Sequence, residues 1–167
     1  DFDVDGELNS PLLKPKKRYY RSSPAVLDVY RPSDTIHLPI REQCRVLYIP
    51  TSYAGNKIYG PYHMYEDATY RRWQKELFKC LPSLVFKVHP KSMSKPPNKL
   101  SLELRRLEDC IPDYDVLIID YFATGSMLAL VSDKPVIYFD IGLRRLHSEF
   151  DRDVKSRCEY ARIDMDE

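Results

Sequence analysis

The sequence has no long apolar run and no closely spaced pair of cysteines. Its apolar stretches are well short of the ~18 residues that cross a bilayer, so we expect no membrane-spanning helix. No charged segment followed by an apolar one is present, so we expect no signal peptide. The four cysteines form no CxxC pair, which argues against a zinc site or a disulfide framework and favours reduced thiols: Cys44, Cys80, Cys110 and Cys158.

Several short motifs of common enzyme classes are also missing. The absence of HxH and HExxH means that we expect no metal site. Neither GxGxxG nor GxxxxGK[ST] occurs, which argues against Rossmann dehydrogenases and P-loop NTPases. No GxSxG occurs, so an α/β-hydrolase is disfavoured as well.

Neither positive nor negative charge is in large excess, because the chain has 26 basic and 25 acidic residues. A net charge of +1 gives no bulk indication of nucleic-acid binding, and we expect no nucleic-acid partner. With 167 residues, 43% of them hydrophobic, the chain is long enough for one domain with a substantial core. Since the first residue is not Met, we expect a piece of a longer protein.

The chain divides into an irregular N-terminal part, 1–40, and a regular part, 41–167. Five prolines interrupt the first part and forbid a long helix, so we expect a linker or an N-terminal extension there. A short basic cluster, Lys14 to Arg18, is best interpreted as solvated linker, with anionic lipid or a polyanionic acceptor as the alternative.

The second part alternates apolar strands with helical patterns. We expect helices over 64–81, 100–107 and 126–132, with partial helix in 143–158. The expected strands lie between them and are mostly apolar on both faces: 45–49, 84–88, 116–119, 135–139 and, as a fifth candidate, 160–163. This alternation predicts an α/β fold, a Rossmann-like parallel sheet with helices on both faces.

Ligands of such sheets bind beyond the carboxyl ends of the strands, where this sequence places polar and small residues. The segment Thr124-Gly125-Ser126 follows a strand and opens a helix, so its N–H groups and hydroxyls suit a phosphate. An ordinary helix cap uses the same groups and stays an alternative. The other strand-end candidates are Thr51, Ser52, His89, Pro90, Asp120, Tyr121 and Asp140 to Gly142.

Two of these candidates carry distinct expectations. A neutral imidazole at His89 can donate to a ribose or phosphate, and a protonated one adds a counter-charge; the alternative is a histidine that caps a strand. Asp120 can contact a sugar hydroxyl or orient the turn, and a structural role is the commoner one. Asp113 and Asp115 precede their strand, so we expect them at the opposite edge, outside the site.

Other residues have weaker indications. The loop Thr51 to Tyr62 holds two glycines and suits a lid over a base or sugar, or a surface loop; its aromatic candidates, with the next residue, are Tyr53, Tyr59, Tyr62 and His63. We expect Trp73 in the core and assign His37 and His147 no role.

The order of motifs VLYIPTS, FKVHP, DVLIIDYFATGSMLAL and KPVIYFD resembles the C-terminal half of bacterial surface-polymer glycosyltransferases of GT-B architecture. The nearest pattern is that of CDP-glycerol glycerophosphotransferases (teichoic-acid polymerases) and of capsule and lipopolysaccharide transferases. The likeness covers roughly Cys44 to Asp140. His89-Pro90 matches the family's HP motif and Asp120-Tyr121 its acid–tyrosine pair. The family's two adjacent serines are replaced here by Phe122 to Ser126.

The resemblance implies a donor-nucleotide-binding domain and metal-independent transfer from a CDP-, CMP- or UDP-linked sugar or glycerol, without a separate cofactor. It implies that His89 is catalytic, since it and the helix N-terminus would stabilise charge on the departing phosphate. A glycan or lipid-linked acceptor and the general base would depend on an N-terminal GT-B domain outside this chain. The implied location is the cytoplasm, at the inner face of the plasma membrane.

Two other readings stay open at this point. A UDP-sugar 2-epimerase shares the GT-B layout and a histidine at a similar strand end, but it would want more carboxylates at strand tips than this sequence offers. A non-catalytic nucleotide-binding or scaffold module has the same sheet, because fold alone does not fix function.

Overall fold

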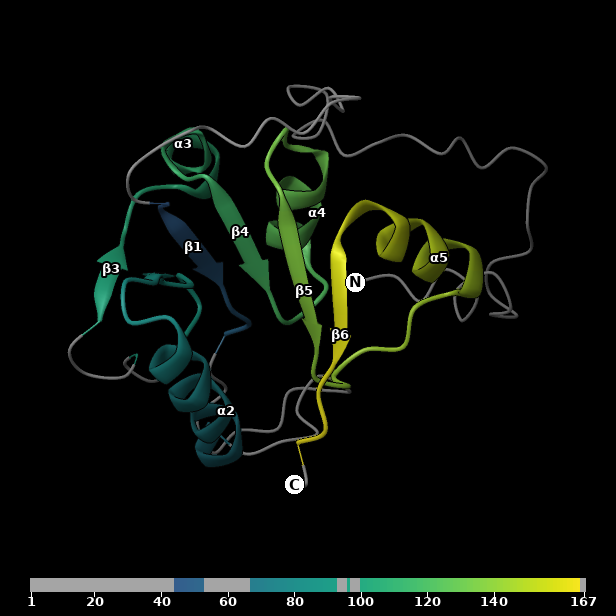
Figure 1. Ribbon diagram of the computed structural model, residues 1–167, viewed down its shortest axis with the longest axis horizontal. Helices are drawn as coiled ribbons and strands as arrows, with labels where there is room; N and C mark the ends of the chain where they lie inside the picture. The colour runs from purple at the N-terminus through teal and green to yellow at the C-terminus, as the bar shows by residue number, and fades with distance from the viewer. Residues whose placement is uncertain (1–43, 53–66, 93–95, 97–99, 166–167) are drawn as a thin grey trace.

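The structure is a computed structural model that describes residues 44–52, 67–92, 96 and 100–165. It contains a six-stranded sheet of order β3-β2-β1-β4-β5-β6 in which every pairing is parallel. The arrows of β1, β4 and β5 run in the same direction in Figure 1. The predicted α/β fold with a Rossmann-like parallel sheet is confirmed. The linker 1–40, His37 and the aromatic loop with Tyr53, Tyr59, Tyr62 and His63 lie outside the described residues.

The central strands form where apolar and β-branched residues follow one another. The strands are β1 (Val46–Ile49), β2 (Val85–Lys87), β3 (Ser101–Glu103), β4 (Val116–Ile119), β5 (Val136–Asp140) and β6 (Glu159–Arg162). The helices are α2 (Asp67–Cys80), α3 (Leu107–Cys110), α4 (Thr124–Val131) and α5 (Ser148–Arg157), with a 3-10 turn, η3 (Ile111–Asp113). The predicted fifth strand therefore exists as β6, and the charged segment 143–158 is helical in its second half.

The helix predicted over 100–107 is wrong, because this segment forms β3 and only then begins α3. Its leucines suit a strand equally well, since Leu100, Leu102 and Leu104 also follow a period of two. Pairing with β2 decides the outcome, with Val85 opposite Ser101 and the strands in register to Glu103. Tertiary pairing thus overrides a helical spacing that the sequence alone left ambiguous.

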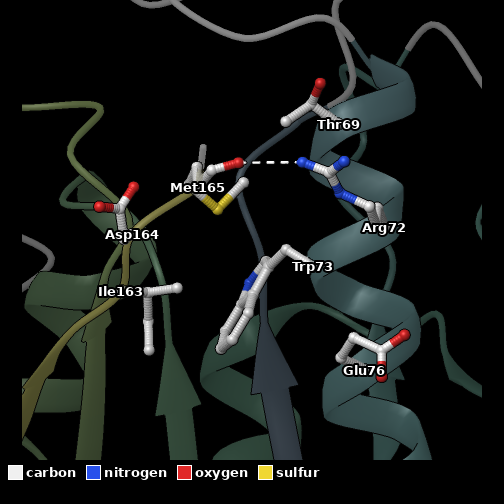
Figure 2. Close-up of a pocket in the computed structure, with 7 residues that line it drawn as sticks. All are labelled: Thr69, Arg72, Trp73, Glu76, Ile163, Asp164 and Met165. Carbon is white, nitrogen blue, oxygen red and sulfur yellow. Dashed lines mark hydrogen bonds between the residues drawn. The ribbon is translucent and has the colours of Figure 1, made fainter. Parts of the chain in front are cut away.

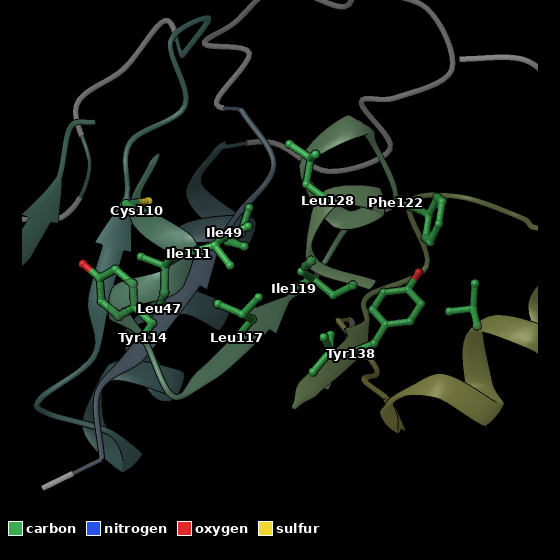
Figure 3. Close-up of a cluster of buried hydrophobic side chains, with 13 residues drawn as sticks. Leu47, Ile49, Cys110, Ile111, Tyr114, Leu117, Ile119, Phe122, Leu128 and Tyr138 are labelled. Atoms are coloured by element: carbon green, nitrogen blue, oxygen red, sulfur yellow. The ribbon is translucent and has the colours of Figure 1, made fainter. Parts of the chain in front are cut away.

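Two apolar clusters, one on each face of the sheet, form the core. The first, shown in Figure 3, packs Leu47 and Leu117 of the sheet against Leu128 of α4 and Val154 of α5. The second packs Tyr48, which lies between Leu47 and Ile49 in β1, against Tyr70 of α2. Alternate residues of each strand therefore face opposite helical layers, as expected for a sheet covered on both sides.

Candidate functional site

The direction of the strand order reverses between β1 and β4, the two neighbours at the centre of the sheet. In open parallel sheets this reversal creates a crevice at the carboxyl edge, which is where ligands bind. Here this switch point, where such a crevice is expected, lies between Thr51-Ser52, after β1, and Tyr121 to Thr124, after β4. Because all strands are parallel, the segments that begin at His89 and Ile141 follow their strands at the same edge.

The opposite edge holds the acids that sequence reasoning left out. The Asp115 carboxylate accepts the Arg45 N–H at 2.8 Å, and the Asp115 N–H donates to the Arg45 carbonyl at 2.8 Å. Both residues lie before the first residue of their strands. Asp115 therefore closes the amino end of the sheet, as predicted.

Asp120 directly follows β4 at the switch point but faces the protein interior, with only 1% of its surface exposed. Its Oδ2 accepts hydrogen bonds from the hydroxyls of Tyr48 and Tyr70 and from Trp73 Nε1, the last at 3.3 Å. Its Oδ1 accepts the Thr51 N–H at 3.2 Å. Asp120 thus joins β4 to β1 and α2, which supports its structural alternative and leaves no exposed carboxylate for a sugar hydroxyl.

Burial raises the pKa of Asp120 to about 6, although all four hydrogen bonds act to lower it. Burial and the neighbouring Asp120 carboxylate raise the pKa of both Tyr48 and Tyr70 well above 10. The two phenols are therefore neutral donors over the physiological range, and the carboxylate is held without a cationic partner among the described residues.

Ser126 also turns inward. Its hydroxyl donates to the Tyr121 carbonyl and accepts the Ala123 N–H at 3.4 Å, and the residue is 2% exposed. This is one half of a capping box, in which the third helical residue reaches back to the residue before the helix. The hydroxyl predicted to meet a phosphate is consequently engaged in shaping the turn.

The amino end of α4 has no side-chain cap from the residue before the helix. The residue before the helix is Ala123, which offers no side-chain acceptor, whereas a serine or aspartate is usual there. Thr124, the first helical residue, is exposed and follows β4 at the switch point. The amino end of α4 therefore presents donors of the kind that bind an anion.

Gly125 allows α4 to pack closely on the core. A Cβ at this position would lie 3.2 Å from Ile49 Cγ2 and 3.4 Å from Leu107 Cδ2. The helix begins so close to β1 that a side chain would crowd the first core cluster. Sequence reasoning identified the glycine but not this role in packing, and its expected approach to a ligand stays a prediction.

His89 is half-buried two residues after β2, beside the exposed Pro90. Its Nδ1 accepts the Lys91 N–H at 3.1 Å, so the neutral ring carries its proton on Nε2. Burial, with the charges of Lys91 and Lys87, lowers the pKa of His89. The imidazole is therefore a neutral donor at pH 7, which fits the first of its two predicted forms.

Arg144 was missed by sequence reasoning. Its guanidinium donates to the Phe122 carbonyl at 2.7 Å and lies 5.9 Å from the centre of the Tyr121 ring. It is half-buried, whereas the following Arg145 is exposed. A signal in the sequence could have found it, because Arg144 and Arg145 form a basic pair shortly after Gly142, at a strand end. Polar residues at strand ends were the candidates taken from the other strands.

A pocket of about 300 Å³ lies on the α2 side of the same edge, between α2 and the segment after β6. Figure 2 shows Trp73 on its floor and the hydrogen bond, 3.0 Å long, from Arg72 to the Met165 carbonyl. Trp73 packs edge-on against Phe139 and is half-buried, so it joins the second cluster as predicted and also lines this pocket.

Two further observations concern the part of the chain that the structure describes. It contains no group of three or more His, Cys, Asp or Glu side chains placed to hold a metal ion. None of its helices combines the length and the apolar character needed to cross a membrane.

Comparison with known proteins returns no match: no protein-family model, no curated protein and no solved structure is similar enough to count.

Proposed function

We propose that this chain is the donor-nucleotide-binding domain of a glycosyltransferase or glycerophosphotransferase that builds bacterial surface polymers. The observation that carries the proposal is the reversal of strand order between β1 and β4, beside which α4 begins without a side-chain cap. Nucleotide phosphates bind at such switch points because helix N–H groups and the helix dipole favour anions. The sequence resemblance supplies the reaction class.

In this proposal each polar group has one task. The N–H groups at Thr124 and the hydroxyls of Thr51 and Ser52 bind the phosphates, and Arg144 adds a positive charge beside them. His89 Nε2–H donates to a phosphate oxygen or to the ribose, since Nδ1 is occupied by the Lys91 N–H.

The proposed chemistry is electrostatic. Cleavage of the bond between the donated group and the phosphate leaves negative charge on the phosphate, and fixed donors stabilise it without a metal. The acceptor and the general base would be supplied by an N-terminal GT-B domain. We therefore expect this domain to bind a nucleotide donor without turning it over, at a site that operates in the cytoplasm beside the membrane.

The test is calorimetric titration of the purified chain with CMP, CDP, UMP, UDP and GDP, first without metal and then with Mg²⁺. We expect one base to bind without metal and His89→Ala to weaken that binding by ~1–3 kcal/mol. Lys79→Ala is the matched control, because Lys79 is an exposed residue at the far end of α2 that pairs with Glu76. Binding that His89→Ala leaves unchanged would overturn the site assignment.

A second candidate function is a non-catalytic nucleotide-binding or scaffold module. It is favoured by the use of Asp120 and Ser126 inside the fold, which leaves fewer groups for chemistry. The two candidates separate in the full-length protein, since only a transferase loses polymer synthesis on His89→Ala. The 2-epimerase alternative is less favoured, because the strand-end acids Asp120 and Asp140 both have protein partners.

A further inference from the structure

The Asp120 carboxylate joins three segments that meet at the carboxyl edge of the sheet, beside the switch point. It belongs to the end of β4, it accepts the N–H of Thr51 at the end of β1, and it accepts hydrogen bonds from Tyr70 and Trp73 of α2. All of these donors are neutral. A buried charge held only by neutral donors is costly, so a structure that keeps one needs its hydrogen bonds.

The donors differ in how they respond to a proton on the carboxylate. The Tyr48 and Tyr70 hydroxyls can rotate and accept, and Tyr48 already accepts a hydrogen bond from Gln74 Nε2 at 3.2 Å. The Thr51 N–H and the Trp73 indole N–H can only donate. Protonation therefore weakens those two hydrogen bonds first, which are also the longer ones at 3.2 and 3.3 Å.

We infer that Asp120 is a positioning residue of the nucleotide site: its ionised carboxylate holds Thr51 and α2 in place, and its protonation loosens them and weakens nucleotide binding. This inference rests on the proposed function for its ligand. The positioning part concerns the chain itself and is measurable without any nucleotide.

Among the residues that the structure describes, the tyrosines around Asp120 do not change charge in the same range. Tyr48 from β1 and Tyr70 from α2 face the carboxylate, and the pKa of each is raised by burial. Tyr138 from β5 feels its charge and has a pKa that burial also raises. The Asp120 pKa of about 6 puts its own change of charge in mildly acidic solution.

The chain has a single tryptophan, so its indole N–H gives one resonance that needs no assignment. We would follow this resonance in the ¹⁵N-labelled chain from pH 5 to 8 without ligand. The expected result is one sigmoidal shift in the wild type, with a higher midpoint in Tyr70→Phe, which removes a donor to the ionised form. The shift should be absent in Asp120→Asn.

Asp164→Asn is the matched control, because Asp164 lines the same pocket as Trp73. It should keep the titration of the wild type. An indole resonance that does not move with pH, or that still titrates in Asp120→Asn, would overturn the inference. If Asp120→Asn fails to fold, the titration midpoints of the other proteins still test the inference: Tyr70→Phe should raise the midpoint and Asp164→Asn should leave it unchanged.

The second readout is nucleotide affinity, measured as the ratio between wild type and Asp120→Asn. The ratio is needed because the terminal phosphate of a nucleotide also titrates near this range, and it is common to the two measurements. We expect a ratio of about ten at pH 7.5 that falls to about one at pH 5, as for loss of one hydrogen bond to a charged group.

A ratio of one throughout, with a titrating indole, would overturn the positioning role. If no nucleotide binds while the indole titrates, the proposed function fails and Asp120 is a pH-sensitive junction of the fold.

Discussion

Gly125 and Ile49 hold α4 against β1 so closely that a Cβ on the glycine would lie 3.2 Å from Ile49 Cγ2. This approach brings the amino end of α4 to the switch point between β1 and β4. The position of the proposed phosphate site therefore depends on a contact within the core.

Substitution at Gly125 should reveal that contact. In Gly125→Ala, a gain of up to ~1 kcal/mol in helix propensity opposes the crowding. The free energy of unfolding should therefore change by less than about 1 kcal/mol. Gly125→Val adds two methyl groups to the same space and should destabilise the fold by ~1–3 kcal/mol. Urea denaturation measures both. A valine variant as stable as the wild type would mean that α4 can move away from β1 freely.

Asp120→Asn should change the pH dependence of stability. The folded pKa of Asp120 is about 6, above the ordinary value near 4, so the folded chain holds a proton that the unfolded chain has lost between these pH values. The contribution of Asp120 to the free energy of unfolding is then most favourable below about pH 4. It is lost as the pH rises through about 6, by at most roughly 3 kcal/mol.

Asparagine does not titrate, so the stability of Asp120→Asn relative to the wild type should rise between pH 4 and 6 and then level off. Urea denaturation at pH 4.5, 5.5 and 7 measures this difference. A difference that is constant across these values would show that Asp120 has an ordinary pKa in the folded chain.

Glu103 should behave in the opposite way. Hydrogen bonds from Arg105 lower its pKa to about 2, and Tyr114 adds a hydrogen bond at 3.0 Å. The stability that these hydrogen bonds give the folded chain is present above the ordinary pKa of Glu and is lost as the pH falls toward 2. Glu103→Gln should cost ~1–2 kcal/mol at pH 7, and the cost should shrink in acid.

The control for Glu103 is Asp113→Asn, since Asp113 pairs with the same Arg105 at 2.8 Å but is exposed. An exposed pair contributes little, so the change should be under about 1 kcal/mol. Equal losses in the two variants would contradict the importance of burial at Glu103.

The strands and the polar carboxyl edge could be predicted from the sequence because apolar runs such as Val116 to Ile119 end in polar residues. The direction of a side chain at a strand end could not. Asp120 turns inward because Tyr48 and Tyr70 offer donors there, and these lie 72 and 50 residues away in the chain. The strand β3 was missed for a similar reason, since only its pairing with β2 decides between two periodicities of leucine.

Ser126 and Thr124 should separate the shape of the turn from contact with a ligand. Ser126→Ala removes the hydrogen bonds to Tyr121 and Ala123 and should cost ~1–2 kcal/mol of stability. It should also weaken nucleotide binding by ~1–3 kcal/mol, because the turn loses its shape. Thr124→Ala should leave stability within about 0.5 kcal/mol, since the side chain is exposed. Chemical denaturation and calorimetry measure the two effects, and a Ser126→Ala variant of normal stability would contradict the inward hydroxyl.

Arg144 should contribute to nucleotide affinity more than its neighbour Arg145 does. The Phe122 carbonyl holds the Arg144 guanidinium beside the start of α4, so in the proposed site its positive charge lies next to the bound phosphate. Arg144→Lys keeps the charge and loses the planar fork, so it should recover only part of the affinity that Arg144→Ala loses, ~1.5–3 kcal/mol. Arg145→Ala removes the same charge from an exposed position and should change affinity by less than about 0.5 kcal/mol. Calorimetry at 50 and 200 mM salt measures these differences. Equal losses in Arg144→Ala and Arg145→Ala, both abolished by salt, would show that only the general positive charge of this edge attracts the nucleotide.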